Sequence, residues 1–369
     1  MTRRRAGFAS HAPNSTWVRL PPVLAALVLA LALPASAGAY PWPFKPFNRQ
    51  HPIRGFFGDP RTLYLDGVLA DGIDGPGVFS FHQGVDIAAP NGTPIYSVSD
   101  GVAHYLGAET LNVATGTGVT FQYFHIVPIV GEGERVRRSR TILGYVRAPF
   151  GHVHLTEIDD RRVVNPLQPG HLTPYRDRTV PVVRTIAFRN DLGAQNVPLG
   201  LCGRVEIDAQ TYDEPPLRVP GPFDGLPVAP AFVSWTILTR GGGVAVPTRV
   251  AADFRTTLPP NKRFWSVYAR GTYENAPRFG DAQYPSMPGR YVFKLAGRFD
   301  TTLLANGVYT LVVRAADVRG NETVARQRFS VLNSPGACPG SLPAAPEQSA
   351  PPTEPPPVPG SEAAGSVTP

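Results

Sequence analysis

Proline and glycine interrupt this chain so often that long helices are excluded over most of its length. The 369 residues include 42 prolines and 37 glycines, about a fifth of the chain. Proline cannot donate a backbone hydrogen bond, and glycine costs backbone entropy inside a regular element. Both residues therefore favour short strands joined by turns. Because 42% of the residues are hydrophobic, which is enough for a packed core, we predict a globular all-β protein.

The first 39 residues have the features of a secretory signal peptide. Arginines at 3–5 precede an apolar run at 23–33, and small residues follow up to Ala39. A basic start, a short apolar segment and an A-x-A site are typical of such a leader. The apolar run is too short to span a bilayer, so a membrane anchor is the weaker alternative. We predict cleavage after Ala39, with Ala37 as the other candidate, and a secreted, extracellular or cell-envelope-associated protein without stable membrane insertion.

Charge and cysteine content exclude several classes of function. The leader contains four arginines, so its removal lowers the formal net charge from +7 to +3. This charge is too small to indicate nucleic-acid binding, and no basic patch is visible. The two cysteines, Cys202 and Cys338, could form one disulfide in an oxidising compartment. Thiol catalysis is not expected, because neither cysteine has a histidine nearby in sequence.

Turn-forming residues and composition divide the remainder into three segments. Strand-like stretches fill a first region, 40–172, which ends in the turn-forming sequence NPLQPG. A second region, 173–333, has further strand-like stretches at a spacing typical of a β-sandwich. Residues 334–369 are rich in proline, alanine, serine, glycine and glutamate, a composition that predicts a disordered tail.

Two turn signals stand out in the second region. The dipeptide Asn306-Gly307 lies between apolar stretches and predicts a tight β-hairpin turn. The sequence DVRGN at 317–321 resembles the last hairpin of immunoglobulin-like or fibronectin-like bacterial surface domains. We expect its acidic and amide residues to be turn formers, with calcium binding as the less favoured interpretation. Trp235, Trp265 and Tyr309 are expected to be core aromatics.

Four of the eight histidines fall in three short motifs of the first region. The motifs read FHQGVD at 81–86, YFHI at 123–126 and GHVHL at 151–155. Imidazole and carboxylate are the ligands that a catalytic zinc prefers, with three protein groups and one open position. Two histidines separated by one residue project from the same face of a strand, so one can bind metal while the other acts on the substrate.

Each motif alone is more often structural than functional, and only their occurrence together predicts a zinc site. The remaining histidines have no such neighbours and are expected to be structural or solvent-exposed: His11, His51, His104 and His171.

The order of these motifs resembles the lysostaphin/LytM-type zinc endopeptidases, the β-lytic metallopeptidase family. The matching stretches are PIRGFFGDPR at 52–61, FHQGVDIAAPNGTP at 81–94, DGV at 100–102, YFHI at 123–126, GYV at 144–146 and HVHLTE at 152–157. The resemblance spans roughly residues 50–170, about a third of the chain. It implies an antiparallel β-sheet with a groove across one face.

The resemblance also implies the roles of the site residues. It places zinc on His82, Asp86 and His154, and it makes His125 and His152 the catalytic histidines that are not ligands. It leaves open which of these two is the general base. The substrates that it implies are peptide cross-bridges or stem peptides of peptidoglycan.

The motifs predict a secreted zinc metalloendopeptidase that uses a zinc-activated water, and the resemblance implies that it hydrolyses amide bonds in peptidoglycan peptides. One alternative is a non-catalytic envelope scaffold or an activator of cell-wall hydrolases, because relatives that have lost their metal ligands exist. Another is a cell-wall-binding protein that acts through the β-sandwich. The complete ligand set favours the enzyme. The oligomeric state is left open.

Overall fold

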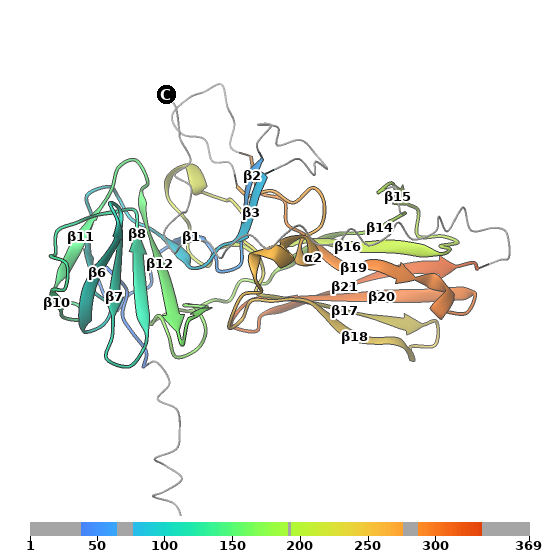
Figure 1. Cartoon of the computed structure of the whole chain (residues 1–369). Helices are drawn as coiled ribbons and strands as arrows, with labels where there is room; N and C mark the ends of the chain where they lie inside the picture. Colours follow the sequence, from blue (N-terminus) through green and yellow to red (C-terminus); the bar gives the residue numbers. More distant parts are fainter. Residues whose placement is uncertain (1–37, 65–76, 191–192, 276–286, 334–369) are drawn as a thin grey trace, which may run out of the picture. The chain divides into compact units, whose positions relative to one another are not determined.

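The computed structural model describes residues 38–64, 77–190, 193–275 and 287–333. Within this part of the chain, nearly all regular structure is β, and the paired strands are antiparallel (Figure 1). The α-helix described there is α2 (Phe264–Val267). The all-β antiparallel expectation is therefore confirmed.

Two sequence predictions fall mainly outside these residues. The predicted leader, except for its last two positions, and the predicted tail at 334–369 both belong to parts of the chain that the structure does not describe. No helix among the described residues is both long and apolar enough to cross a membrane.

The first region contains an eight-stranded sheet and a three-stranded sheet. Across the larger sheet the order is β1 (Ile53–Gly55), β4 (Val85–Ala88), β12 (His152–Asp159), β8 (Thr120–Phe124), β7 (Thr110–Ala114), β6 (Gly101–Gly107) and β10 (Arg135–Val136), and β13 (Arg162–Val164) also pairs with β12. The smaller sheet has the order β5 (Pro94–Tyr96), β11 (Ile142–Val146) and β9 (Ile126–Pro128). A separate two-stranded antiparallel sheet consists of β2 (Pro60–Tyr64) and β3 (Gly77–Phe81).

Strand β12 positions the site because it is buried on both faces. Its two-residue side-chain period places Val153 and Leu155, both fully buried, on one face. The same period sends His152 and His154 to the opposite face, and these histidines are also buried. Strand β4 pairs with β12 so that Asp86 lies directly across from His154. The His-x-His motif is therefore on a strand, as predicted.

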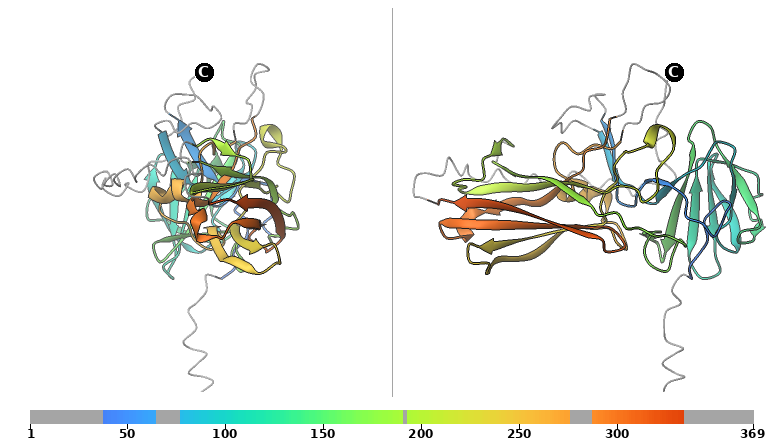
Figure 2. Two further views of the ribbon diagram at one scale, coloured as in Figure 1. Left: turned by 90° about the vertical axis from the view of Figure 1, so that its right-hand side faces the viewer. Right: turned by 180° about the vertical axis from the view of Figure 1, so that it is seen from behind.

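The second region is a β-sandwich of two four-stranded sheets. One sheet has the order β15 (Gln195–Asn196), β14 (Val182–Arg189), β16 (Arg204–Tyr212) and β19 (Val292–Asp300). The other has the order β18 (Val244–Asp253), β17 (Phe232–Thr239), β20 (Gly307–Ala316) and β21 (Glu322–Val331). Short 3₁₀ turns are η1 (Gly221–Phe223), η2 (Asn261–Arg263) and η3 (Thr301–Leu303). In the rear view of Figure 2, β14 and β16 of the first sheet are yellow-green, and β20 and β21 of the second sheet are orange-red.

The two sheets share one hydrophobic core. Ile207 of β16 and Phe293 of β19 are fully buried in the same cluster as Trp235 of β17 and Leu311 of β20. Tyr309 belongs to this cluster and Trp265 packs against it, so all three aromatics lie in or against the core as expected. The immunoglobulin-like or fibronectin-like relationship of this sandwich stays a prediction.

The hairpin predicted at Asn306-Gly307 is wrong. Strand β19 ends before this dipeptide in one sheet, and β20 begins at Gly307 in the other sheet, so the two strands do not pair. The connection crosses between layers through η3. The Asn306 side chain accepts a hydrogen bond from the backbone N–H of Asn333. The turn-forming residues were recognised correctly, but a local signal cannot tell a hairpin from a crossover between sheets.

Cys202 is disulfide-bonded in this structure. Its predicted partner, Cys338, lies outside the described residues. No free cysteine is present in the described part of the chain.

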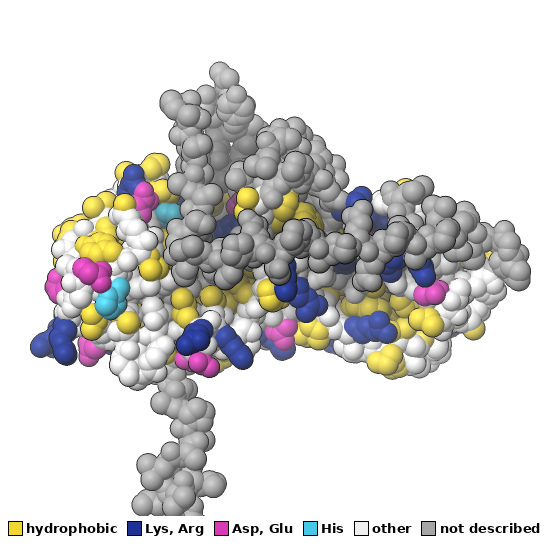
Figure 3. All heavy atoms as spheres, viewed as in Figure 1, with side chains coloured by type: hydrophobic (Ala, Val, Ile, Leu, Met, Phe, Trp, Pro, Cys, Tyr) yellow, Lys and Arg dark blue, Asp and Glu magenta, His cyan; other side chains and the backbone are white. Residues whose placement is uncertain are grey.

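Charged side chains are dispersed over the drawn surface of the described residues. On the face drawn in Figure 3, Lys and Arg side chains are scattered among apolar and uncharged ones. The expectation that nucleic acid is not a partner stays a prediction.

The first region contributes side chains to the core of the second. Phe57 and Phe81 are buried in the sandwich cluster, and the Phe81 ring lies 5.6 Å from that of Phe254, centroid to centroid. The Asp59 carboxylate accepts hydrogen bonds from the backbone N–H groups of Phe56, at 2.8 Å, and Ala229, at 2.7 Å. The boundary expected between residues 172 and 173 stays a prediction, because packing continues across these segments.

Replacing Asp59 by alanine should destabilise the protein by about 2–6 kcal/mol. Asp59 is 2% exposed, and its removal leaves two buried N–H groups without an acceptor, each of which costs about 1–3 kcal/mol. The measurement is urea denaturation of the full chain followed by intrinsic fluorescence. Asp224→Ala is the matched control, because Asp224 pairs with the exposed Arg218. Equal denaturation midpoints for both variants would contradict this role of Asp59.

Candidate metal centre

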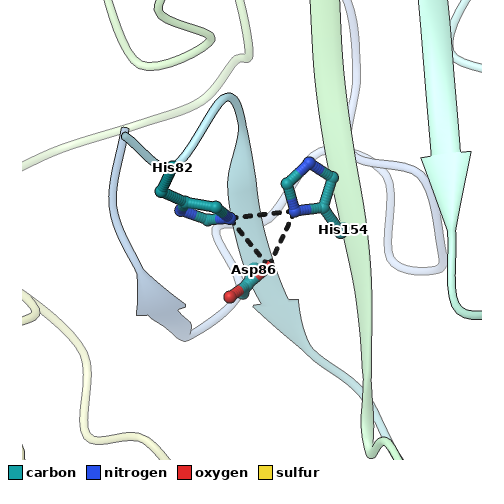
Figure 4. A group of neighbouring side chains, drawn as sticks. All are labelled: His82, Asp86 and His154. Atoms are coloured by element: carbon teal, nitrogen blue, oxygen red, sulfur yellow. Dashed lines mark hydrogen bonds and ion pairs between the residues drawn. The ribbon is translucent and has the colours of Figure 1, made fainter. Parts of the chain in front are cut away.

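Three side chains meet beside β4 and β12. His82 lies just before β4, Asp86 is on β4 and His154 is on β12, and Figure 4 shows their polar ends pointing toward one another. The Nε2 atom of His82 is 2.9 Å from Nδ1 of His154. The Oδ1 atom of Asp86 is 3.1 Å from the first nitrogen and 3.0 Å from the second. All three residues are buried, so they form one compact group of nitrogen and oxygen donors.

The second nitrogen of each imidazole has its own partner. His82 donates from Nδ1 to the backbone carbonyl of Phe56 at 2.8 Å. The Nε2 atom of His154 lies 2.7 Å from the hydroxyl oxygen of Thr156. When these outer nitrogens carry the ring protons, the inner nitrogens present lone pairs to each other and to the carboxylate. Such outer partners orient the ligand histidines of metal sites.

This arrangement fits a zinc ion. Two lone pairs and a carboxylate oxygen at about 3 Å repel one another unless a cation lies between them. Tetrahedral zinc with bonds of about 2.0–2.1 Å requires ligand atoms about 3.3 Å apart, close to the observed spacing. Burial, reinforced by the charge of Arg61, lowers the pKa of His82 to about 4. The imidazole is therefore neutral at pH 7, which metal binding requires.

An arginine holds the other oxygen of Asp86. Burial alone would raise the pKa of Asp86, but His82 and Arg61 hold this pKa well below its usual range. The Arg61 guanidinium donates to Oδ2 at 2.5 Å. Arg61 also lies 4.0 Å from Glu274 of the second region. The carboxylate is thus ionised and fixed in orientation.

Two glycines leave room for the ligands. A Cβ atom at Gly84 would lie 2.7 Å from Nε2 of His154 and 2.4 Å from the backbone oxygen of Leu155. A Cβ atom at Gly55 would lie 2.6 Å from Oδ2 of Asp86. These distances are too short for any other residue type to fit without displacing a ligand.

Replacing Gly84 by alanine should therefore lower zinc affinity by about 10- to 100-fold. The added methyl group pushes His154 away from its hydroxyl partner on Thr156, 2.8 Å from the new Cβ, and lost outer partners cost metal affinity in this range. Competition with a chromophoric chelator measures the affinity. Gly116→Ala is the matched control because a Cβ there meets nothing within 4 Å. Unchanged affinity in the Gly84 variant would argue against the site.

The two further histidines of the prediction lie next to this group. His152 donates from Nδ1 to the carbonyl of Phe150 at 2.9 Å, so Nε2 carries a lone pair. That Nε2 is 3.5 Å from Oδ1 of Asp86 and 3.3 Å from the Arg54 guanidinium. The His125 ring lies 4.5 Å from the His152 ring and stacks on Phe150 at 4.3 Å, both measured between ring centroids.

The backbone of His125 is in an unusual conformation. Its φ of 61° lies in the left-handed region, which non-glycine residues seldom occupy. The residue lies between β8 and β9 and separates the two strands. Such backbone strain often accompanies functional positions. Here it turns the imidazole toward His152 and Phe150.

The other histidines have structural or surface environments. His171 lies 2.9 Å from the buried carboxylate of Glu157, which also accepts a hydrogen bond from Tyr40. His104 pairs with Glu132 at the exposed surface. His51 packs against the rings of Trp42 and Phe44. His11 lies outside the described residues.

Comparison with known proteins concerns this same segment. Residues 80–166, which contain all five predicted site residues, match the family model of Peptidase family M23. This match supports a peptidase role for the segment.

Several solved structures are similar to part of the chain. The catalytic domain of the prophage-encoded M23 protein EnpA from Enterococcus faecalis is 23% identical over 30% of this chain and 92% of that chain, with a TM-score of 0.22. A zinc-containing peptidase from Vibrio cholerae is 25% identical over 34% of this chain and 39% of that chain, with a TM-score of 0.27. Helicobacter pylori Csd3 is 24% identical over 34% of this chain and 37% of that chain, with a TM-score of 0.24.

Proposed function

We propose that this protein is a secreted zinc metalloendopeptidase that hydrolyses amide bonds in peptidoglycan peptides. The observation that carries the proposal is the convergence of His82, Asp86 and His154 to about 3 Å, with their outer atoms already bonded. The match of this segment to a peptidase family supports amide hydrolysis. The peptidoglycan substrate rests on the order of the sequence motifs, and secretion rests on the leader-like N-terminus.

The ion would be held by the three converging donors. Bound there, zinc supplies Lewis-acid chemistry: it polarises the scissile carbonyl and lowers the pKa of water to about 7. The protein supplies the groups that move protons and stabilise charge. Two imidazoles beside the ligands, His125 and His152, are the candidates for both tasks.

His152 has a neutral ring nitrogen positioned to accept a proton. Burial, which outweighs the opposing charge of Asp86 and is reinforced by Arg54, holds the pKa of His152 well below its usual range. The ring is therefore neutral at pH 7. Its Nδ1 hydrogen bond to Phe150 leaves Nε2 as the acceptor, 3.5 Å from the ligand oxygen of Asp86. We assign His152 as the general base and His125 as a partner for developing charge.

Digestion of purified peptidoglycan tests the proposal. The chain lacking residues 1–39 is loaded with zinc, and release of soluble peptides and new amino groups is followed over time. We expect one zinc per chain and release that a chelator such as 1,10-phenanthroline abolishes. His104→Ala should behave like the unaltered chain, because His104 is at the exposed surface. Bound zinc without amide cleavage would refute the peptidase assignment.

The non-catalytic alternative makes a different prediction. A scaffold or activator needs no bound zinc, so the absence of stoichiometric zinc would favour it over the enzyme.

One structural observation bears on the role of the second region. Phe223 of η1 lies under the Arg54 guanidinium at 4.0 Å, and Glu274 approaches Arg61. The second region therefore contacts both arginines of the candidate site.

A further inference from the structure

A second group of acidic side chains lies away from the histidines. Asp177 precedes β14, Asp213 follows β16, and Asp317 begins the turn between β20 and β21. Their side chains are 8%, 1% and 2% exposed. One carboxylate oxygen from each lies within 4.8 Å of the others. Oxygens bound to one calcium ion at about 2.3–2.6 Å are at most about 5 Å apart, so the spacing suits a single ion.

Among the described residues, no Lys, Arg or His side chain lies within ion-pair distance of these carboxylates. None of the three forms an ion pair there, whereas the equally buried Asp208 is 3.1 Å from the guanidinium of Arg189. Buried charges are normally paired or bound to a metal, because the loss of hydration is otherwise uncompensated. Three carboxylates so close together add mutual repulsion to this cost.

Among the described residues, one of these carboxylate oxygens has no hydrogen-bond partner. The Asp177 carboxylate accepts from Tyr175 and Thr179, and that of Asp317 accepts from backbone and side-chain N–H groups of the following turn. Asp213 accepts at Oδ1 from the N–H of Glu214, but its buried Oδ2 accepts no hydrogen bond from the part of the chain that the structure describes. Burial, with an added contribution from Asp177 and Asp317, raises the pKa of Asp213 to about 8.

Space is also present beside two of the carboxylates. Asp213 and Asp317 line the same cavity of about 10 Å³, whose other walls include Phe56 and Asn165. This volume is close to that of one water-sized sphere. Asp213, whose Oδ2 has no hydrogen-bond partner among the described residues, therefore borders an internal cavity and not a closely packed apolar core.

We propose that Asp177, Asp213 and Asp317 bind a calcium ion. The ligand set consists of oxygen atoms alone, which suits hard cations and not zinc. Calcium accepts several carboxylates in flexible geometry, whereas magnesium demands octahedral ligands and retains several waters. The ion would join the segment before β14 to both sheets of the sandwich. Asn321, which donates to the Asp177 carbonyl and to the Asp317 carboxylate, already links two of these segments.

Thermal unfolding of the zinc-loaded full chain tests this site. We expect calcium chloride at about 100 times its dissociation constant to raise Tm by about 5–10 °C. Equilibrium dialysis with radioactive calcium should find one ion per chain at this site. Magnesium chloride at the same concentration should raise Tm by less. No calcium effect, or an equal magnesium effect, would overturn the assignment to calcium.

Asp213→Asn separates ion binding from a structural role. Its side-chain oxygen can still accept from the N–H of Glu214, and the carboxylate that the ion would bind is removed. Without calcium this variant should therefore have a Tm equal to or above that of the unaltered chain, and calcium should no longer raise it. Asp177→Asn serves the same purpose if the first variant does not fold. An unchanged calcium response in both variants would refute the site.

His154→Ala makes the result independent of the proposed peptidase activity. This variant loses a candidate zinc ligand and keeps all three carboxylates, so calcium should raise its Tm as in the unaltered chain. Loss of the calcium effect in this variant would instead assign the effect to the histidine centre.

Discussion

Replacing His154 by alanine should remove bound zinc and abolish peptide release from peptidoglycan. The variant loses one of three donors that lie about 3 Å apart. Its affinity for zinc should fall by more than the 10- to 100-fold that loss of an outer partner causes. Metal content after gel filtration, measured by atomic absorption, and amino-group release are the two readouts.

The matched control for this variant is His104→Ala. Both changes remove one imidazole, but His104 lies at the surface with Glu132, so its loss should alter neither zinc content nor activity. Circular dichroism of both variants shows whether the fold is kept. Retention of stoichiometric zinc by a folded His154 variant would remove His154 from the ligand set.

The candidate metal centre could be predicted from sequence because its geometry is mostly local. The two-residue period of a strand puts His152 and His154 on one face whatever the tertiary structure. His82 and Asp86 are four residues apart, and the glycine between them allows the bend that brings them together. The distant part of the arrangement, the meeting of His154 with His82 and Asp86, came from the family resemblance, and the structure adds that β4 pairs with β12.

The outer partners of the site could not be predicted in the same way. Arg61 is 25 residues from Asp86 in sequence, and Glu274 lies much further along the chain. No periodicity connects residues so far apart, so only the fold reveals that they meet. The only sequence indication of these partners was that Arg54 and Arg61 lie in the stretch 52–61, which matches the family.

The acidic group in the sandwich shows the same limit more strongly. The sequence around Asp317 reads as a turn, and the turn is present, with Asn321 donating to the Asp317 carboxylate. The sequence does not indicate that Asp177 and Asp213, which belong to separate segments, lie close to Asp317. Local chemistry therefore predicted the turn correctly and missed a cluster that arises only from packing.

Replacing His152 by alanine should leave zinc in place and lower the rate of amide hydrolysis by about 10²- to 10⁴-fold, the range for loss of a general acid or base. His152 contacts the ligand oxygen of Asp86 only at 3.5 Å, and its own hydrogen bonds go to Phe150 and Arg54. None of the three converging donor atoms belongs to it. Zinc content and the initial rate of amino-group release should therefore separate in this variant, whereas they fall together in the His154 variant.

The comparison between neighbouring histidines on one strand is a strict test, because both are buried and both changes remove the same atoms. A cavity or a local loss of packing on β12 would affect the two variants similarly. Only different roles predict zinc loss at one position and zinc retention at the other. If the His152 variant loses zinc as well, this histidine helps to hold the ion, and the general base must be sought at His125, whose ring lies 4.5 Å from that of His152 between centroids.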